Sequence, residues 1–175
     1  MSTIIVAVIV ISIITGICLI LVSINNKQRK KTGTELLNHF SKLATENNLS
    51  FSSQEILENC IIGLDGVQRK LLILKKIDKD GYDSILLDLN EVKTCSQKKI
   101  YTRINIGTSK KEKFENHLDK IVLEFDFIDN RQPVQILFYE PITNHLFAMS
   151  ELEHKAKKWE TILSQIVHTG LKKIA

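Results

Sequence analysis

The chain has few of the residues that break regular structure or cross-link a small fold. Its 175 residues include two prolines, seven glycines and three cysteines. So little proline and glycine argues against a long disordered linker. Cys60 and Cys95 are far apart and Cys18 lies within an apolar run, so we expect buried thiols rather than a disulfide framework.

Charged residues are absent from residues 3–24, TIIVAVIVISIITGICLILVSI. A helix over this stretch would be about 33 Å long, enough to cross a hydrocarbon core of about 30 Å. It shows no polar face, which a core helix of a soluble domain should have. A cleavable signal peptide would need preceding basic residues, a shorter apolar run and a small-x-small cleavage site, and none is present. We therefore expect an uncut transmembrane anchor over residues 1–26 that contacts the lipid bilayer through residues 3–24.

A basic cluster of Lys27, Arg29, Lys30 and Lys31 follows this run directly. By the positive-inside rule, it predicts a single-pass cell-membrane protein with its N-terminus outside and its C-terminal domain in the cytoplasm. The chain has 24 Lys and Arg against 20 Asp and Glu, so these four residues account for the whole positive excess. A neutral remainder argues against binding to nucleic acid. The cluster either sets topology alone or also attracts anionic headgroups, at about 1 kcal/mol per basic residue.

Residues 27–54 are expected to form a basic juxtamembrane segment and a connecting helix over residues 32–48. Thr34 is its expected N-cap. The helix should have one apolar face, made of Leu36, Leu37, Phe40, Leu43 and Ala44.

The remaining residues, 55–175, have the length of one ordinary domain. Asp65-Gly66 separates two apolar runs and predicts a hairpin turn, because both residues tolerate positive φ. Alternation over residues 121–128 predicts a half-buried strand, whereas the charged stretch 107–120 is expected to be a loop or a short helical excursion. The six expected strands cover residues 59–64, 67–77, 82–89, 98–106, 121–128 and 134–140.

The C-terminal region predicts one amphipathic helix. Ser150 and Glu153 form a capping box at its start, and the sequence TGLKKIA, residues 169–175, is expected to be a polar tail. Trp159 lies at the centre of the apolar face and is expected to plug the core rather than to bind a ligand. The face consists of Leu152, Ala156, Trp159, Ile162, Leu163 and Ile166.

This order of antiparallel strands, tight turns and a final helix with a central Trp resembles the pleckstrin-homology (PH-like) architecture. The resemblance covers roughly residues 55–168 and implies an α+β fold, an antiparallel barrel closed by the C-terminal helix. The whole chain also resembles small, uncharacterised membrane-anchored bacterial proteins. The lipid-binding members have a basic pattern around the first strand pair. Here Asp65 occupies that turn and Arg69 and Lys70 would point to opposite faces, so phosphoinositide recognition is not implied.

No motif predicts a catalytic, cofactor-binding or metal-binding residue, so we do not expect an enzyme. Residues 78–83, DKDGYD, fail as a calcium loop, because the position-1 ligand would be Lys76 and the position-12 ligand Leu87. The five histidines lack metal-ligand spacing. A Cys-His nucleophile at Cys60 or Cys95 is less favoured than a buried thiol.

Three functional hypotheses remain. The first is an interaction domain that binds an unidentified membrane or cytoplasmic protein, as a scaffold or accessory subunit, through an exposed strand edge. The second is a lipid sensor that reads headgroups with the basic cluster and with Arg69 and Lys70. The third is an enzyme with an unrecognised site, which would need a pocket with convergent polar groups.

Overall fold

The computed structural model describes residues 33–58, 60–77, 81–105 and 114–174. The predicted anchor, its bilayer-contacting residues 3–24 and the basic cluster all lie outside these residues. Within the described part of the chain, no helix is both long and apolar enough to cross a membrane. The chain divides into two compact units between Asn48 and Leu49.

Residues 33–46 are helical, which confirms a helix within the predicted range 32–48. Its predicted apolar face is largely buried, with Leu36, Phe40 and Ala44 between 1% and 8% exposed. Thr34 lies inside the helix, so the N-cap prediction is wrong. The helix ends where Asn48 takes the left-handed conformation, at φ 52°, that commonly terminates helices.

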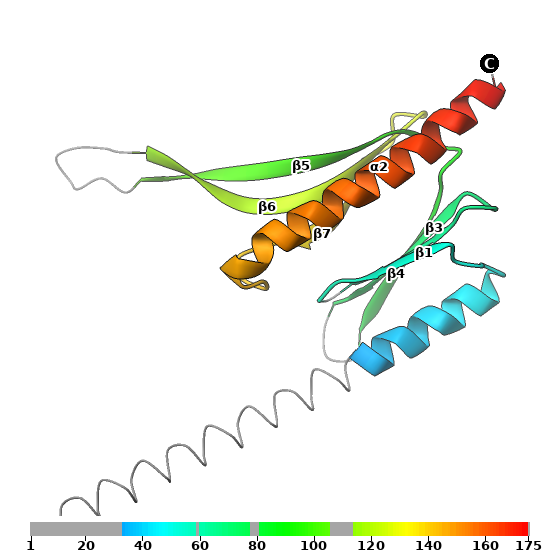
Figure 1. Ribbon diagram of the computed structural model, residues 1–175, viewed down its shortest axis with the longest axis horizontal. Helices are drawn as coiled ribbons and strands as arrows, with labels where there is room; N and C mark the ends of the chain where they lie inside the picture. Colours follow the sequence, from blue (N-terminus) through cyan, green and yellow to red (C-terminus); the bar gives the residue numbers. More distant parts are fainter. Residues whose placement is uncertain (1–32, 59, 78–80, 106–113, 175) are drawn as a thin grey trace, which may run out of the picture. The chain divides into compact units, whose positions relative to one another are not determined.

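The second unit contains two antiparallel sheets followed by a long helix (Figure 1). In the four-stranded sheet, each strand pairs with the next along the chain, in the order β1-β2-β3-β4. The three-stranded sheet has the order β5-β6-β7. The elements are β1 (Ser53–Ile56), β2 (Cys60–Asp65), β3 (Lys70–Lys76), β4 (Tyr82–Asp88), β5 (Val92–Asn105), β6 (Phe114–Phe127), β7 (Val134–Tyr139), η1 (Leu146–Ala148) and α2 (Met149–Ile174).

The β2–β3 hairpin confirms the predicted turn but not its geometry. Asp65 ends β2 opposite Lys70 of β3, so the connection has four residues, Gly66 to Arg69. Arg69 has the positive φ, 57°, whereas neither Asp65 nor Gly66 is among the residues with positive φ. The Asp65 carboxylate instead folds the turn by accepting hydrogen bonds from the backbone N–H groups of Val67 (2.9 Å) and Gln68 (2.8 Å).

The structure has seven described strands where the sequence predicted six. The additional strand is β1, and β6 begins at Phe114, inside the stretch predicted as a loop or helical excursion. The described residues between 101 and 104 and between 114 and 117 are exposed, so this part of the β5–β6 ribbon has no buried face to impose an alternating pattern.

The predicted strand at residues 121–128 is confirmed as far as Phe127, but it is buried on both faces rather than half-buried. Ile121, Leu123, Phe125 and Phe127 are all buried on one face. Glu124, on the other face, is only 7% exposed, because Lys98 pairs with one of its carboxylate oxygens and Gln135 Nε2 donates to the other at 2.6 Å.

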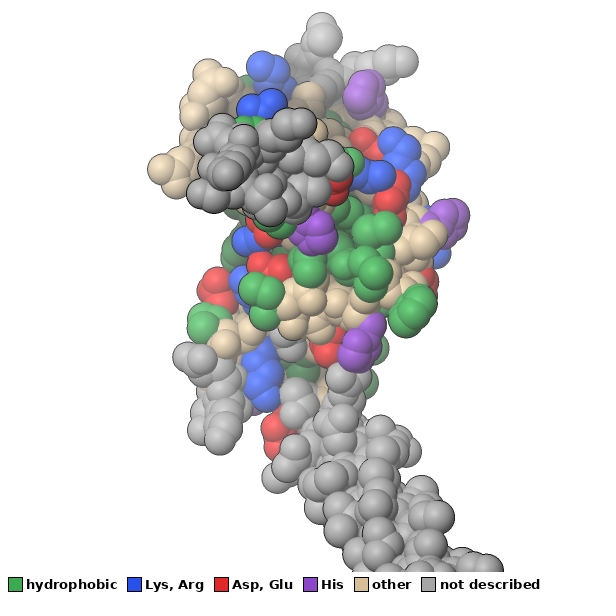
Figure 2. Space-filling view, turned by 90° about the vertical axis from the view of Figure 1, so that its left-hand side faces the viewer, with side chains coloured by type: hydrophobic (Ala, Val, Ile, Leu, Met, Phe, Trp, Pro, Cys, Tyr) green, Lys and Arg blue, Asp and Glu red, His purple; other side chains and the backbone are tan. Residues whose placement is uncertain are grey.

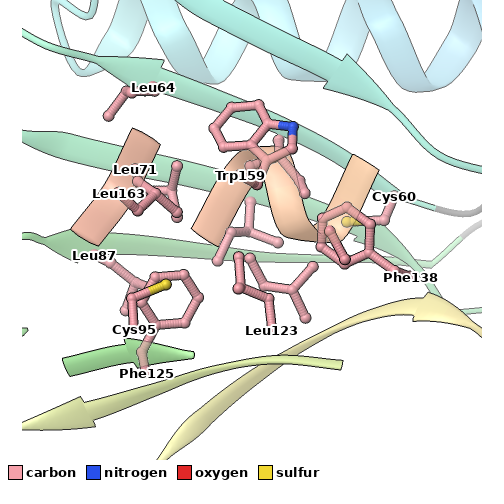
Figure 3. Packing of buried hydrophobic residues seen from close by; sticks show 14 of the residues in the cluster. Cys60, Leu64, Leu71, Leu87, Cys95, Leu123, Phe125, Phe138, Trp159 and Leu163 are labelled. Atoms are coloured by element: carbon pink, nitrogen blue, oxygen red, sulfur yellow. The ribbon is translucent and has the colours of Figure 1, made fainter. Parts of the chain in front are cut away.

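The helix α2 confirms the predicted amphipathic helix but not its ends. It begins at Met149, so Ser150 lies inside it and does not cap it, and it extends to Ile174 through the predicted polar tail. Its buried side chains join those of both sheets in one core (Figure 3), which includes Trp159 and Leu163 of α2, Leu71 of β3 and Phe125 of β6. Five α2 residues are fully part of this core: Leu152, Ala156, Trp159, Leu163 and Val167.

The fold is therefore α+β with two antiparallel sheets, but the predicted closed barrel is wrong. Among the described strands, none pairs across the gap between the four-stranded and three-stranded sheets. The physical reason is visible at β5, where side chains of α2 occupy the hydrogen-bonding positions that a neighbouring strand would use.

Candidate functional site

The two outer strands of the three-stranded sheet differ in what covers their free edges. At β5, Ser164 Oγ of α2 donates to the Cys95 carbonyl oxygen at 3.2 Å. The Gln97 N–H donates to Glu160 Oε1 of α2 at 3.1 Å. An added strand would have to displace α2 to reach this stretch, so the β5 edge is covered here.

The free edge of β7 instead lines a cleft between the two sheets, with a volume of about 270 Å³. Four consecutive β7 residues, Gln135 to Phe138, contribute to its wall. Successive strand side chains point to opposite faces, so four in a row can line one cavity only if the strand presents its backbone edge. None of the described strands pairs with this edge.

The floor of the cleft is apolar and comes from the inner face of the four-stranded sheet. Ile73 of β3 is paired with Ile85 of β4, and both line the cleft. Leu57, Ile136 and Phe138 also belong to the apolar lining and are buried. A cleft of this size and character suits one large apolar side chain and a short length of the backbone that carries it.

The rim of the cleft is polar and mixed in charge. Lys75 and Lys76 lie on it together with Asp83, Glu58 and Glu140. With acidic groups at least as numerous as basic ones, the rim is poorly suited to a phosphate or an anionic headgroup. It can instead pair with the N–H and C=O groups of a polypeptide.

One wall of the cleft is held in place by hydrogen bonds of Asn144, in the connection between β7 and η1. Asn144 Oδ1 accepts from the Glu140 N–H at 3.0 Å, and Asn144 Nδ2 donates to Glu58 Oε2 at 3.1 Å. Lys120 Nζ also pairs with Glu140 Oε1 at 3.2 Å. The connection is thereby fixed to the residues that follow β1, which preforms the mouth of the cleft.

Neither of the two described cysteines, Cys60 and Cys95, is an activated nucleophile. Cys60 lines the cleft, and burial raises the pKa of its thiol to about 12, against a smaller opposing effect of Lys75. Burial likewise raises the pKa of Cys95 to about 12, and Glu160 adds to the shift. Both thiols stay protonated near neutral pH. No histidine is among the described residues that line the cleft, and no described group of three acidic, His or Cys side chains could hold a metal ion.

The structure places the other singled-out residues away from the cleft. Trp159 is 2% exposed in the core. Arg69, which the lipid-sensor hypothesis used, donates from its guanidinium to the Ile166 carbonyl oxygen of α2. Lys70 begins β3, opposite Asp65 on one side and Asp88 on the other.

The sequence analysis did not predict the cleft residues. The cleft depends on the distance between the two sheets, and that distance produces no periodic pattern in the sequence of either sheet.

Scans against protein-family models, curated proteins and solved structures found nothing that matches this chain.

Proposed function

We propose that the chain is a membrane-anchored interaction protein whose second unit binds an extended segment of a protein partner along the β7 edge. The observation that carries the proposal is the free β7 edge lining an apolar cleft. An unpaired strand edge offers a row of backbone donors and acceptors that a peptide can complete as an added strand.

The chemistry of the cleft favours one kind of segment. An apolar side chain such as Leu, Ile or Phe would fill the space over Ile73 and Ile85. Its neighbours in an extended chain would point away from the floor and meet the mixed-charge rim. The segment should therefore be short and extended, with one apolar anchor flanked by polar residues.

The membrane setting is a second part of the proposal. The apolar run at residues 3–24 and the basic cluster after it support a single-pass anchor with this unit in the cytoplasm. Such a protein would act as a scaffold or an accessory subunit. The order of four strands, three strands and a C-terminal helix supports a PH-like origin in which the two sheets have stayed open at the β7 edge.

The test is site-specific photo-crosslinking of the full chain in native membranes. A diazirine-bearing lysine analogue replaces Asp83, an exposed residue on the cleft rim. The matched control carries the same probe at Ser84, the next residue of β4, which is also exposed but does not line the cleft. We expect an adduct with one extended segment of one protein from position 83 and none from position 84.

A blocking variant makes the test specific to the cleft. Ile85→Trp should fill the floor and remove the adduct, whereas Leu86→Trp, on the opposite face of the same strand, should leave it. An adduct that forms equally from both probe positions, or that survives Ile85→Trp, would contradict binding at the cleft.

A further inference from the structure

The connection between β7 and α2 carries three large apolar side chains that project into solvent. Ile142 is 93% exposed, Leu146 is 68% exposed and Phe147 is 97% exposed. All three lie within the short stretch of residues 141–148, between the end of β7 and the start of α2. Figure 2, which views the molecule from the left of Figure 1, shows hydrophobic side chains gathered in the middle of the face on that side.

This connection is held by hydrogen bonds, and two of its polar side chains, Thr143 and Asn144, are half-buried. The Asn144 N–H donates to the Glu140 carbonyl oxygen at 2.8 Å, and the Ala148 N–H donates to the His145 carbonyl oxygen at 2.9 Å. Asn144 and Thr143 line the cleft, whereas the three apolar side chains are exposed and are not among its lining residues. Surface connections usually show the reverse arrangement, so the outward apolar groups indicate a partner that offers an apolar environment.

The charge distribution is also compatible with an apolar partner surface. Residues 141–149 contain no Asp, Glu, Lys or Arg, so none of them carries a fixed charge that insertion would have to desolvate. The flanking acidic side chains are already neutralised. Lys120 pairs with Glu140 at 3.2 Å, Lys155 with Glu151 at 3.0 Å and Lys99 with Glu153 at 2.7 Å.

We propose that Ile142, Leu146 and Phe147 insert into the headgroup boundary of a lipid bilayer and so orient the second unit on the membrane surface. Side chains that stand almost free of the surrounding protein suit a fluid bilayer better than a complementary protein surface, which needs shape matching over a continuous patch. One step rests on the proposed function, because it assumes the predicted membrane anchor. Residues 25–48 alone separate the predicted span from the second unit, and this short tether raises the effective concentration of the connection at the bilayer.

The test uses tryptophan fluorescence of the full chain, reconstituted into vesicles of phosphatidylcholine and phosphatidylglycerol. Part of the lipid is brominated near the headgroup end of its acyl chains, which quenches an inserted indole. Phe147→Trp places a reporter on the connection. Trp159 is the single natural tryptophan and is buried, so the parent chain supplies the baseline.

Val67→Trp is the matched control, because Val67 is apolar and 92% exposed on the β2–β3 turn. We expect brominated lipid to reduce the fluorescence of the Phe147→Trp chain and to leave the Val67→Trp chain at the baseline. Adding Ile142→Ser and Leu146→Ser to the Phe147→Trp chain should diminish the quenching.

Equal quenching of the two reporters, or none of either, would overturn the inference. So would a Trp at position 147 that is shielded from an aqueous quencher but insensitive to brominated lipid, since that result indicates a protein contact. These outcomes are independent of the cleft, because crosslinking from Asp83 can succeed or fail whatever the connection contacts.

Discussion

The outer strands β5 and β7 belong to one sheet and pose the same problem, an unpaired backbone edge, but the fold treats them differently. The Cys95 carbonyl and the Gln97 N–H on β5 are both satisfied by side chains of α2. The β7 edge faces a cleft instead. Exposed edges invite pairing with other chains, and proteins usually cover or blunt them. Because the same sheet has one covered edge, at β5, and one open edge, at β7, the comparison of the two edges says more about binding than either edge alone.

The same contrast separates the buried and projecting aromatic side chains. Trp159 is 2% exposed and joins the core that connects α2 with both sheets, whereas Phe147, twelve residues earlier in the chain, is 97% exposed. We describe the region around α2 and β5 as the covered side of the unit, and the cleft with the connection of residues 141–148 as its open side. Stability should depend on the first and binding on the second.

Trp159→Ala should produce the largest loss of stability, because it removes the largest fully buried side chain and leaves a cavity in the core. We expect a loss of about 3–5 kcal/mol in the free energy of unfolding, as is typical of such truncations. Phe147→Ala, on the open side, should change it by less than about 0.5 kcal/mol. Chemical denaturation of the full chain, followed by circular dichroism, measures both. Similar losses for the two variants would mean that the two sides do not differ in this way.

Asp65→Asn should have the next largest effect, because Asp65 holds the turn from which Arg69 reaches α2 on the covered side. The carboxylate accepts backbone N–H bonds from Gln68, Ser50 (2.7 Å) and Val67, and these bonds, that of Gln68 first, lower the pKa of Asp65. A lowered folded pKa means that this stabilisation is complete above the ordinary Asp pKa of about 3.9 and is lost as pH falls through the folded value. Removal of the charge should cost about 1–3 kcal/mol at neutral pH.

The measurement for Asp65 is the free energy of unfolding of the full chain as a function of pH. The parent should lose stability on acidification below the ordinary Asp pKa, and Asp65→Asn should show a shallower loss over the same range. Asp88→Asn is the control, because Asp88 also accepts a local N–H, from Asn90 at 2.9 Å, but at an exposed turn. A parent and an Asp65→Asn chain with parallel pH profiles would show that the three N–H bonds do not depend on the charge.

The elements that the sequence predicted well are those with one face in the core. Alternation over residues 121–128 and the helical spacing around Trp159 both arise from contact with a single buried cluster. The strand start at Phe114 escaped prediction because the outer part of the β5–β6 ribbon is exposed on both faces. The cleft was not predicted from the sequence for another reason. Gln135 and Ile85 come from different sheets, and the gap between sheets depends on where α2 lies, which no local pattern encodes.

The contacts through which α2 covers the β5 edge likewise left only weak signals in the sequence. Glu160 and Ser164 lie four residues apart on α2 and look like ordinary polar positions of an amphipathic helix. Their role on β5 becomes visible only once the helix lies along that strand.

The smallest expected effect concerns the hydrogen bond between Gln97 and Glu160, by which α2 covers the β5 edge. Glu160→Ala removes the acceptor of the Gln97 N–H, and we expect a loss of about 1 kcal/mol in the free energy of unfolding, the usual net value of one hydrogen bond. Glu151→Ala is the control on the same helix, since Glu151 is exposed and pairs only with Lys155 in the described contacts. Amide hydrogen exchange should accelerate at Gln97 in Glu160→Ala and stay unchanged in Glu151→Ala. If Gln97 keeps its protection in both variants, Glu160 does not cover the β5 edge, and the contrast with β7 would then rest on Ser164 alone.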